Sequence, residues 1–248
     1  MNLINQEFLL VDKPAGMSSF AVVARIRRVL TEQMREDYAV REAAVLRGEM
    51  PKEVLGAKPP KRAKVGHAGT LDPFATGLLI CLLGKGTKRA GEFLKKDKRY
   101  EATIRLGMVS STGDIEGELS EYAVSEIPDI SRIEAVVKSF QGEIRQRVPA
   151  YSAVKINGRR AYDLARKGVQ VEMPEREVRI YDIKVVSYEW PELKIDCKVS
   201  SGTYIRALGE DIGKVLGVGG YLTALRRTEI GDFSVKDAVR LEDLGILD

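Results

Sequence analysis

The sequence is poor in the residues that most often carry metal or redox chemistry, since it contains one histidine and two cysteines among 248 residues. A single histidine, His67, cannot form a multi-histidine metal site. Cys81 and Cys197 are far apart in the sequence and form no CxxC pair, which excludes a zinc knuckle and indicates a reducing compartment. Any chemistry must therefore come from carboxylate, lysine, tyrosine or hydroxyl groups.

The sequence also lacks a long apolar run. No stretch approaches the roughly 20 apolar residues that a membrane span requires, and the N-terminus has no signal-peptide pattern. With 44% hydrophobic and 31% charged residues, the composition is that of an ordinary globular protein. We expect a cytoplasmic protein without membrane contact.

The pattern of apolar residues predicts alternating strands and helices without an internal repeat. Strands are expected at Phe8–Val11, Leu78–Leu83 and Arg99–Leu106, and both cysteines look like small buried residues on strands. Two long alternating strands, Val178–Tyr188 and Leu193–Ser200, are joined by a hairpin-like connection, which favours a mainly antiparallel sheet. Helices are expected in four other places: after Ser18 or Ser19 with Phe20, Val23, Ile26 and Leu30 on one face, at Thr87–Lys95, at 131–141, and from Gly202 to Leu216. Ser110–Glu118 is expected to be a loop.

Two segments stand apart from this core pattern. Residues 31–62 are charged and resemble a surface insertion with some helical pattern. Residues 141–179 hold nine basic and five acidic residues, interleaved with tyrosines and the turn Asn157-Gly158, and carry an expected helix at Arg159–Lys167. The second segment suits an arm that grips phosphates and stacks on bases, although a solvated helix face explains the charge equally well.

The stretch from Gly66 to Gly77 is the strongest local signal for a site. Its glycines permit unusual backbone angles and Pro73 fixes a bend, so that the carboxylate of Asp72 can be presented rigidly to a ligand. An ordinary Asp-Pro turn is the alternative. Gly84-Lys85-Gly86-Thr87 fails the phosphate-loop template, because Leu79 and Gly86 replace the required glycine and hydroxyl residue, so no nucleotide cofactor is expected.

Six motifs in order resemble the bacterial tRNA pseudouridine synthases of the TruB type, which modify uridine 55 in the T-loop. The motifs are Val11–Ser19, Gly66–Pro73, Lys98–Ala102, Tyr151–Lys155, Gly202–Arg206 and Leu225–Thr228, and they extend over nearly the whole chain. The resemblance implies an α+β fold: a mixed, mainly antiparallel sheet flanked by helices, with a thumb-like RNA-binding insertion at 141–179. It also implies a single catalytic domain over residues 1–248, with the segment 31–62 as an insertion. We expect the C-terminal RNA-binding (PUA) domain of the family to be absent.

The resemblance also assigns roles to residues of this chain. Asp72 corresponds to the catalytic carboxylate of uridine isomerisation, Tyr100 to the tyrosine that stacks on the target base, and Arg206 to the arginine that pairs with the carboxylate. His67, Tyr204 and Leu225 correspond to residues that contact the flipped uridine, and Lys13 to structural support near the site. Lys155, Arg159 and Arg160 of the thumb-like segment are expected to contact RNA. Leu225 and Tyr100 could instead be ordinary core residues.

The activity implied is the conversion of uridine to pseudouridine by base flipping, cleavage of the C1′–N1 bond and re-formation through C5. The resemblance implies that the reaction needs no metal and no organic cofactor. The expected partner is the T-arm of tRNA, bound by a monomer. Two alternatives stay open: a non-catalytic RNA-binding or RNA-folding protein, and a guide-RNA-dependent pseudouridine synthase. Whether Asp72 forms a covalent adduct or promotes a glycal-like intermediate is also open.

Overall fold

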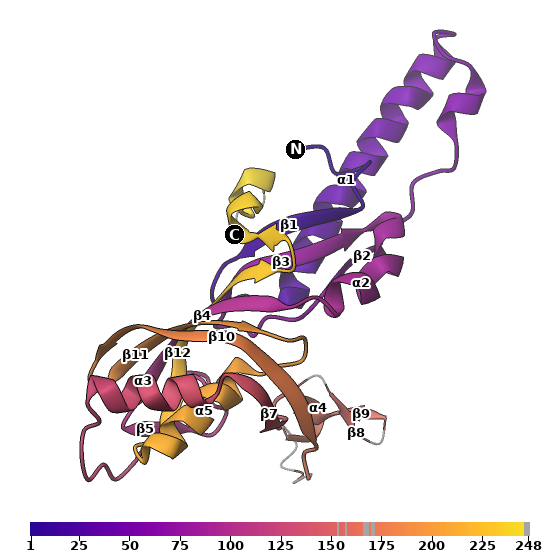
Figure 1. The fold of residues 1–248 in the computed structure, drawn as a ribbon. Coiled ribbons are helices and arrows are strands. Elements are labelled where there is room, and N and C mark those ends of the chain that lie inside the picture. The colour runs from indigo at the N-terminus through magenta and orange to yellow at the C-terminus, as the bar shows by residue number, and fades with distance from the viewer. Residues whose placement is uncertain (153, 157, 166–168, 170–171, 246–248) are drawn as a thin grey trace. The chain divides into compact units, whose positions relative to one another are not determined.

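The computed structural model describes residues 1–152, 154–156, 158–165, 169 and 172–245. The chain divides into two compact units (Figure 1). Unit 1 consists of Met1–Lys95 together with Ile230–Asp248, and unit 2 consists of Lys96–Glu229. The pairs β1–β3, β10–β11, β10–β7 and β11–β4 are antiparallel, and helices pack beside strands in both units. The expected α+β class with a mainly antiparallel sheet is therefore confirmed.

Unit 1 is built on three strands with β3 at the centre. β1 pairs with β3 from Phe8 opposite Leu82 to Lys13 opposite Gly77, and β2 pairs with the last three residues of β3. The elements of this unit are β1 (Phe8–Lys13), α1 (Ser19–Leu46), η1 (Lys52–Leu55), β2 (Val65–His67), β3 (Thr76–Leu83), η2 (Gly84–Arg89), α2 (Ala90–Leu94), β13 (Phe233–Ser234), η3 (Val235–Asp237) and η4 (Glu242–Leu244).

The apolar run Leu78–Leu83 is a strand buried on both faces, as the sequence predicts. Its alternate residues enter two clusters: Leu79, Cys81 and Leu83 pack with α1, whereas Leu78, Ile80 and Leu82 pack with Phe93. Cys81 here and Cys197 in unit 2 are both fully buried, and burial raises the pKa of each thiol to about 12. The two cysteines are structural, as expected.

Helix α1 begins where the sequence predicts but extends much further. The Ser18 side chain caps it by accepting a hydrogen bond from the amide of Ala21 at 3.1 Å. Val23, Ile26 and Leu30 are buried, but Phe20 is 68% exposed, so its assignment to the packing face is wrong. At 3.6 residues per turn, Phe20 projects roughly 100° away from the centre of the buried face.

The segment 31–62 starts inside α1, because the helix continues without a break to Leu46. The rest of the segment contains the turn η1 and returns toward β2. Figure 1 shows the C-terminal half of α1 projecting beyond the strands of unit 1. The insertion is therefore half helix, continuous with the core helix, rather than a separate surface loop.

The main sheet of unit 2 has the strand order β12-β4-β11-β10-β7, and β5–β6 and β8–β9 form two further two-stranded sheets. The predicted hairpin is present, with β10 and β11 pairing around a tight connection at Trp190-Pro191. The elements of unit 2 are β4 (Lys98–Leu106), β5 (Met108–Ser110), β6 (Leu119–Glu121), α3 (Ile130–Ser139), β7 (Gly142–Arg147), β8 (Lys155–Ile156), β9 (Arg159–Arg160), α4 (Ala161–Ala165), β10 (Glu175–Glu189), β11 (Glu192–Val199), α5 (Ile205–Leu216) and β12 (Gly220–Ile230), whose last residue belongs to unit 1.

Close backbone contacts set the position of α5 in this unit. The helix ends at Gly217 in the left-handed conformation (φ +76°), and a Cβ atom added to Gly213 would lie 2.3 Å from the carbonyl carbon of Gly219. Only glycine permits that approach between α5 and the start of β12. The helix that carries Tyr204 at its N-cap and Arg206 in its first turn is thereby fixed against the sheet.

Two predicted helices differ from the structure. Thr87–Lys95 is a 3-10 turn, η2, followed by the short α2. The helix expected at Arg159–Lys167 is the short strand β9 followed by α4, and Arg166 and Lys167 lie outside the described residues. In both places glycine or paired strand residues interrupt the helical pattern.

Candidate functional site

The loop that carries Asp72 is held by hydrogen bonds on both sides of that residue, all within unit 1. The Ser19 hydroxyl at the start of α1 donates to the carbonyl oxygen of Leu71 at 2.9 Å and accepts from its amide at 2.8 Å. The amide of Gly16 donates to the carbonyl oxygen of Pro73 at 2.9 Å. The Asp72 side chain is half-buried, so the loop presents a fixed and accessible carboxylate.

Lys13 also holds the main chain around this loop through hydrogen bonds. Its ammonium group is fully buried and donates to the carbonyl oxygens of Pro14 at 2.7 Å, Met17 at 2.6 Å and Pro73 at 3.1 Å. A buried lysine that satisfies main-chain oxygens is structural. This geometry agrees with the supporting role expected from the sequence.

His67 ends the short strand β2, opposite Cys81 of β3, and is half-buried. It lies in unit 1 with Asp72. The other four residues that the resemblance assigns to catalysis or uridine binding, Tyr100, Tyr204, Arg206 and Leu225, lie in unit 2. The pairing of Asp72 with Arg206 stays a prediction.

Tyr100 and Leu225 come from two neighbouring strands of the unit 2 sheet. Tyr100 lies on β4 opposite Cys197 and is 8% exposed, and Leu225 lies on β12 and is 7% exposed. Both side chains are thus largely enclosed. That burial suits either a core position or the wall of a pocket for a planar base.

Tyr204 is positioned through its main chain by a buried glutamine. Gln146 of β7 is 0% exposed; its amide donates to the Tyr204 carbonyl oxygen at 3.0 Å and accepts from the Tyr204 amide at 2.8 Å. The Tyr204 ring packs against the small cluster of Val148, Ala161 and Met173, and the Arg176 guanidinium lies 6.0 Å from its centre. Tyr204 therefore contacts the thumb-like segment through both its main chain and its ring.

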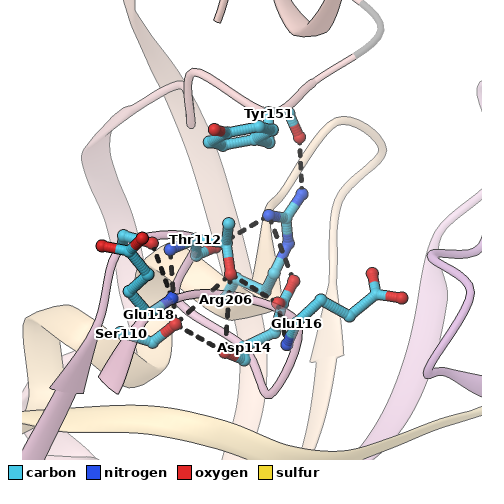
Figure 2. A network of polar contacts seen from close by, with 8 residues as sticks. Ser110, Thr112, Asp114, Glu116, Glu118, Tyr151 and Arg206 are labelled. Atoms are coloured by element: carbon cyan, nitrogen blue, oxygen red, sulfur yellow. Dashed lines mark hydrogen bonds and ion pairs between the residues drawn. The ribbon is translucent and has the colours of Figure 1, made fainter. Parts of the chain in front are cut away.

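Arg206 is the centre of a buried polar network (Figure 2). Its guanidinium forms an ion pair with Asp114 at 3.3 Å, and the two side chains are only 5% and 3% exposed. It also donates to the carbonyl oxygens of Thr112 at 2.8 Å and Tyr151 at 2.7 Å. Three separate segments, the turn at 110–118, the thumb-like segment and α5, thus meet at one guanidinium.

Asp114 is itself held in place by its own turn. Its carboxylate accepts from the Thr112 hydroxyl at 2.6 Å and from the Glu116 amide at 3.0 Å, and its carbonyl oxygen accepts from Ser110 at 2.5 Å. Gly113 precedes it with φ +75°, in the left-handed region that favours glycine. These bonds fix the carboxylate before any ligand binds.

Sequence reasoning did not identify Asp114 or Gln146. The expected loop at 110–118 is present between and around the short strands β5 and β6, but nothing in its composition shows which buried cation it contacts. The sequence Ser111-Thr112-Gly113-Asp114 does carry the signal of a side-chain-stabilised turn, which could have marked Asp114 as a structured carboxylate.

The thumb-like segment contains the hairpin β8–β9, in which Lys155 lies opposite Arg160 and Ile156 opposite Arg159. Arg159 is exposed. The side chains of Lys155 and Arg160, and the residues Ala153 and Asn157, lie outside the described part. The backbone pairing places the three expected RNA-contacting residues on one short hairpin.

Within the described ranges, no group of three or more histidine, cysteine, aspartate or glutamate side chains is arranged to hold a metal ion. Among the described helices, none combines the length and apolar character needed to cross a bilayer.

Two family models match the chain. One describes the N-terminal domain of TruB family pseudouridylate synthases and matches residues 52–205. The other describes a C-terminal domain of tRNA pseudouridylate synthase B and matches residues 206–246. Together they extend over the Asp72 loop, the thumb-like segment, α5 and β12.

Similar curated proteins are tRNA pseudouridine synthases B. The protein from Endomicrobium trichonymphae is 41% identical over 95% of this chain and 89% of its own length. Those from Bordetella avium and Corynebacterium diphtheriae are 40% and 42% identical, over 95% and 98% of this chain and 85% and 73% of their own lengths.

Similar solved structures include a Cbf5-Nop10-Gar1 complex, with 29% identity and a TM-score of 0.66, and an archaeal box H/ACA sRNP Nop10-Cbf5 complex, with 27% identity and a TM-score of 0.62. Each alignment covers 97% of this chain. The chain spans about half of the matched chains, 54% and 53%. These likenesses agree with the α+β fold described above.

Proposed function

Because the chain belongs to the TruB family of pseudouridylate synthases, we propose that it is an enzyme that isomerises uridine to pseudouridine in tRNA. Identity of about 41% to a tRNA pseudouridine synthase B, over nearly the full length of both proteins, carries this proposal. A non-catalytic RNA-binding protein would not need a loop that is held by hydrogen bonds on both sides of one aspartate. A guide-RNA-dependent enzyme is not favoured either, because the curated relatives at 40–42% identity are tRNA pseudouridine synthases, whereas the Cbf5 chains of the RNP complexes are 27–29% identical.

We propose that uridine 55 of the T-loop is the target and that Asp72 is the catalytic carboxylate. The loop geometry supports this role, since both neighbours of Asp72 are hydrogen-bonded while its own side chain stays accessible. A fixed anion can attack or stabilise the electron-poor sugar carbon when the bond from C1′ to N1 breaks, and it can later leave. The base then rotates and C5 bonds to C1′. C5 loses its proton and N1 takes one up, so the product is an isomer of uridine.

The unit 2 residues are proposed to hold the flipped nucleotide during this rearrangement. Tyr100 stacks on the base, Tyr204 and Leu225 line its pocket, and His67 of unit 1 contacts the RNA next to it. Arg206 pairs with the carboxylate and keeps it ionised. The pre-formed Asp114–Arg206 pair and the Gln146 contacts to Tyr204 support these roles, because they fix the two residues before substrate arrives.

The proposal is tested with the purified chain and an unmodified tRNA transcript, without any additive and again with chelator. Pseudouridine is mapped by chemical labelling, and size-exclusion chromatography reports whether the active species is a monomer. We expect product at the T-loop uridine under both conditions. Absence of product from the wild-type chain would contradict the enzyme proposal.

The Asp72→Asn variant separates the enzyme from a binding protein. We expect it to retain tRNA affinity within about threefold while product formation falls by at least about 10³-fold, since the nucleophile or covalent catalyst is removed. Asp232→Asn, a substitution in the turn after β12, serves as the control and should keep wild-type turnover.

A further inference from the structure

The region around the Asp72 loop has an unusual charge pattern. Between residues 54 and 91 the sequence has seven basic residues, and Asp72 is the only acidic one. Arg89 is neutralised by ion pairs with Glu7 at 2.7 Å and Glu92 at 2.9 Å. The six remaining cations are Lys58, Lys61, Arg62, Lys64, Lys85 and Lys88, here called the basic patch.

The basic patch is exposed and carries no compensating acid. All six side chains are exposed, and in the described part of the chain none of them forms an ion pair with an aspartate or glutamate. Its two segments lie side by side, because the amide of Gly84 donates to the carbonyl oxygen of Lys64 at 2.8 Å. Exposed cations without partners attract polyanions by releasing bound counterions.

The backbone that carries Lys58–Lys64 is fixed along helix α1. Arg35 donates to the carbonyl oxygen of Lys61 at 3.0 Å, and the buried Ala63 amide donates to the Thr31 hydroxyl at 2.9 Å. One turn earlier, Arg27 donates to the carbonyl oxygen of Val65 at 2.9 Å. Lys61, Arg62 and Lys64 therefore lie on a segment that is hydrogen-bonded to α1, and Lys58 lies three residues before it.

Helix α1 also gives the distance from these cations to the proposed nucleophile. Ser19, the first residue of α1, contacts Leu71 next to Asp72. At 1.5 Å per residue, Arg27 lies roughly 12 Å and Arg35 roughly 24 Å along the helix from Ser19. An interval of roughly 12 to 24 Å is long enough to follow several base pairs of a helical stem.

We propose that the basic patch binds the phosphate backbone of the substrate RNA on the stem that flanks the flipped nucleotide. This inference rests on the proposed function, since it takes the RNA to enter at Asp72. The patch meets three requirements for such a site: positive charge without acids, a braced backbone, and a fixed distance to the reaction centre within one unit. It extends the RNA-binding surface beyond the thumb-like segment, into the insertion that begins in α1.

The test uses the full chain with Lys61, Arg62 and Lys64 replaced by glutamine. Affinity for a tRNA transcript is measured by filter binding between about 50 and 200 mM salt. We expect affinity to fall by about tenfold or more, and the slope of log K against log salt to decrease in magnitude by roughly 2 to 3, for three lost contacts at about 0.7 to 0.9 each. The single-turnover rate at saturating tRNA should stay within about twofold of wild type.

The matched control removes three exposed lysines from the face of the unit 2 sheet opposite Tyr100. These are Lys184, Lys194 and Lys198, replaced by glutamine. The control changes the total charge by the same amount as the test variant. It should keep the wild-type salt slope, because the proposal places no phosphate contact on these three lysines. Equal losses in both variants, or an unchanged slope in the test variant, would overturn the proposal.

A second RNA locates the contact. A short oligonucleotide containing only the loop lacks the flanking stem, so the test variant should bind it as wild type does. An equal loss of affinity for loop and tRNA would overturn the placement on the stem. If the wild-type chain binds tRNA but forms no pseudouridine, the proposed function fails, while the salt slopes still report on the basic patch.

Discussion

At the residue scale, the Arg206 guanidinium donates to two main-chain oxygens and forms an ion pair with Asp114. Thr112 and Tyr151 contribute carbonyl oxygens, which do not depend on side-chain identity. Backbone geometry therefore helps to set the position of the arginine, and Asp114 supplies negative charge directly beside it.

The variant Asp114→Asn tests how much the negative charge of Asp114 contributes beside Arg206. The amide keeps the shape of the turn but removes the charge beside a cation that is 5% exposed. We expect a loss of about 2 kcal/mol in the free energy of unfolding, below the 3–5 kcal/mol typical of a broken buried pair, because Arg206 keeps its carbonyl partners. Pseudouridine formation should fall by at least about tenfold in single-turnover assays. Glu118→Gln changes an exposed residue of the same turn and should leave both quantities unchanged.

Glu210, one turn after Arg206, gives a prediction for pH dependence. Although the residue is exposed overall, its carboxyl group lies against Gly113, and burial together with Asp211 raises its pKa to about 7 despite the opposing effect of Arg206. The folded state therefore binds this proton more tightly than the unfolded state. Its stabilising contribution is complete below about pH 4.3, the ordinary value for glutamate, and is lost as the pH rises to about 7.

Glu210→Gln should consequently raise the unfolding temperature at pH 8 and change it little at pH 5. Thermal unfolding at both pH values measures the difference. Glu134→Gln, at an exposed position on α3, is the control and should show no such pH dependence. An equal shift at both pH values would contradict a role for the Glu210 proton.

The sequence identified the motif residues but not the side chains that position them. Asp72 and Arg206 could be matched to motifs, whereas Asp114 and Gln146 act through contacts between segments far apart in the chain. Gln146 lies 58 positions from Tyr204, and a buried glutamine in a charged strand gives no periodic signal. Contacts of this kind depend on tertiary structure, which local patterns do not encode.

At the element scale, segments with clear apolar periodicity were predictable, whereas the 11-residue strand β12 and several short strands were not. The buried strand β3, the hairpin β10–β11 and the helices α3 and α5 follow from apolar periodicity. The strands β7, β8 and β9 were missed, because two to six residues with alternating charges resemble a solvated surface. The extent of α1 was also underestimated, because its second half is mostly polar and resembles a charged surface segment.

Lys13→Met tests how β1 supports the Asp72 loop. Methionine preserves the volume but leaves three main-chain oxygens without their donor. We expect the free energy of unfolding to fall by about 2–4 kcal/mol and the single-turnover rate to drop, with tRNA affinity within about threefold of wild type. The matched control is Lys95→Met, at an exposed lysine of the same unit. A stability unchanged from wild type would contradict the structural role of Lys13.

At the scale of the whole molecule, the two units carry different parts of the proposed reaction. Unit 1 holds the carboxylate loop and the basic patch, and unit 2 holds the thumb-like segment and the aromatic residues assigned to the base. Fold class and family could be inferred from the order of the motifs. The division into two units could not be inferred. The residues after β12 return to unit 1 only through tertiary contacts, such as the hydrogen bond from the Asp12 amide to the carbonyl oxygen of Val239.

Shortening the insertion tests its independence from the rest of unit 1. Replacing residues 36–60 with a flexible linker of about six residues keeps the Arg35–Lys61 and Thr31–Ala63 contacts. We expect the unfolding temperature to change by no more than about 4 °C, equivalent to about 1 kcal/mol. Thr31→Val, which leaves the buried Ala63 amide without its acceptor, should destabilise by about 1–3 kcal/mol. A deletion variant less stable than Thr31→Val would contradict this expectation.

The hydrogen bond between Thr31 and Ala63 brings the two ends of the insertion together. Met34 still packs against the core of unit 1, and the chain beyond it is held by contacts within the insertion, such as the hydrogen bond from Arg41 to the carbonyl oxygen of Val54. The same catalytic loop could therefore carry extensions of different length and surface chemistry, each adapting the enzyme to another RNA without any change near Asp72.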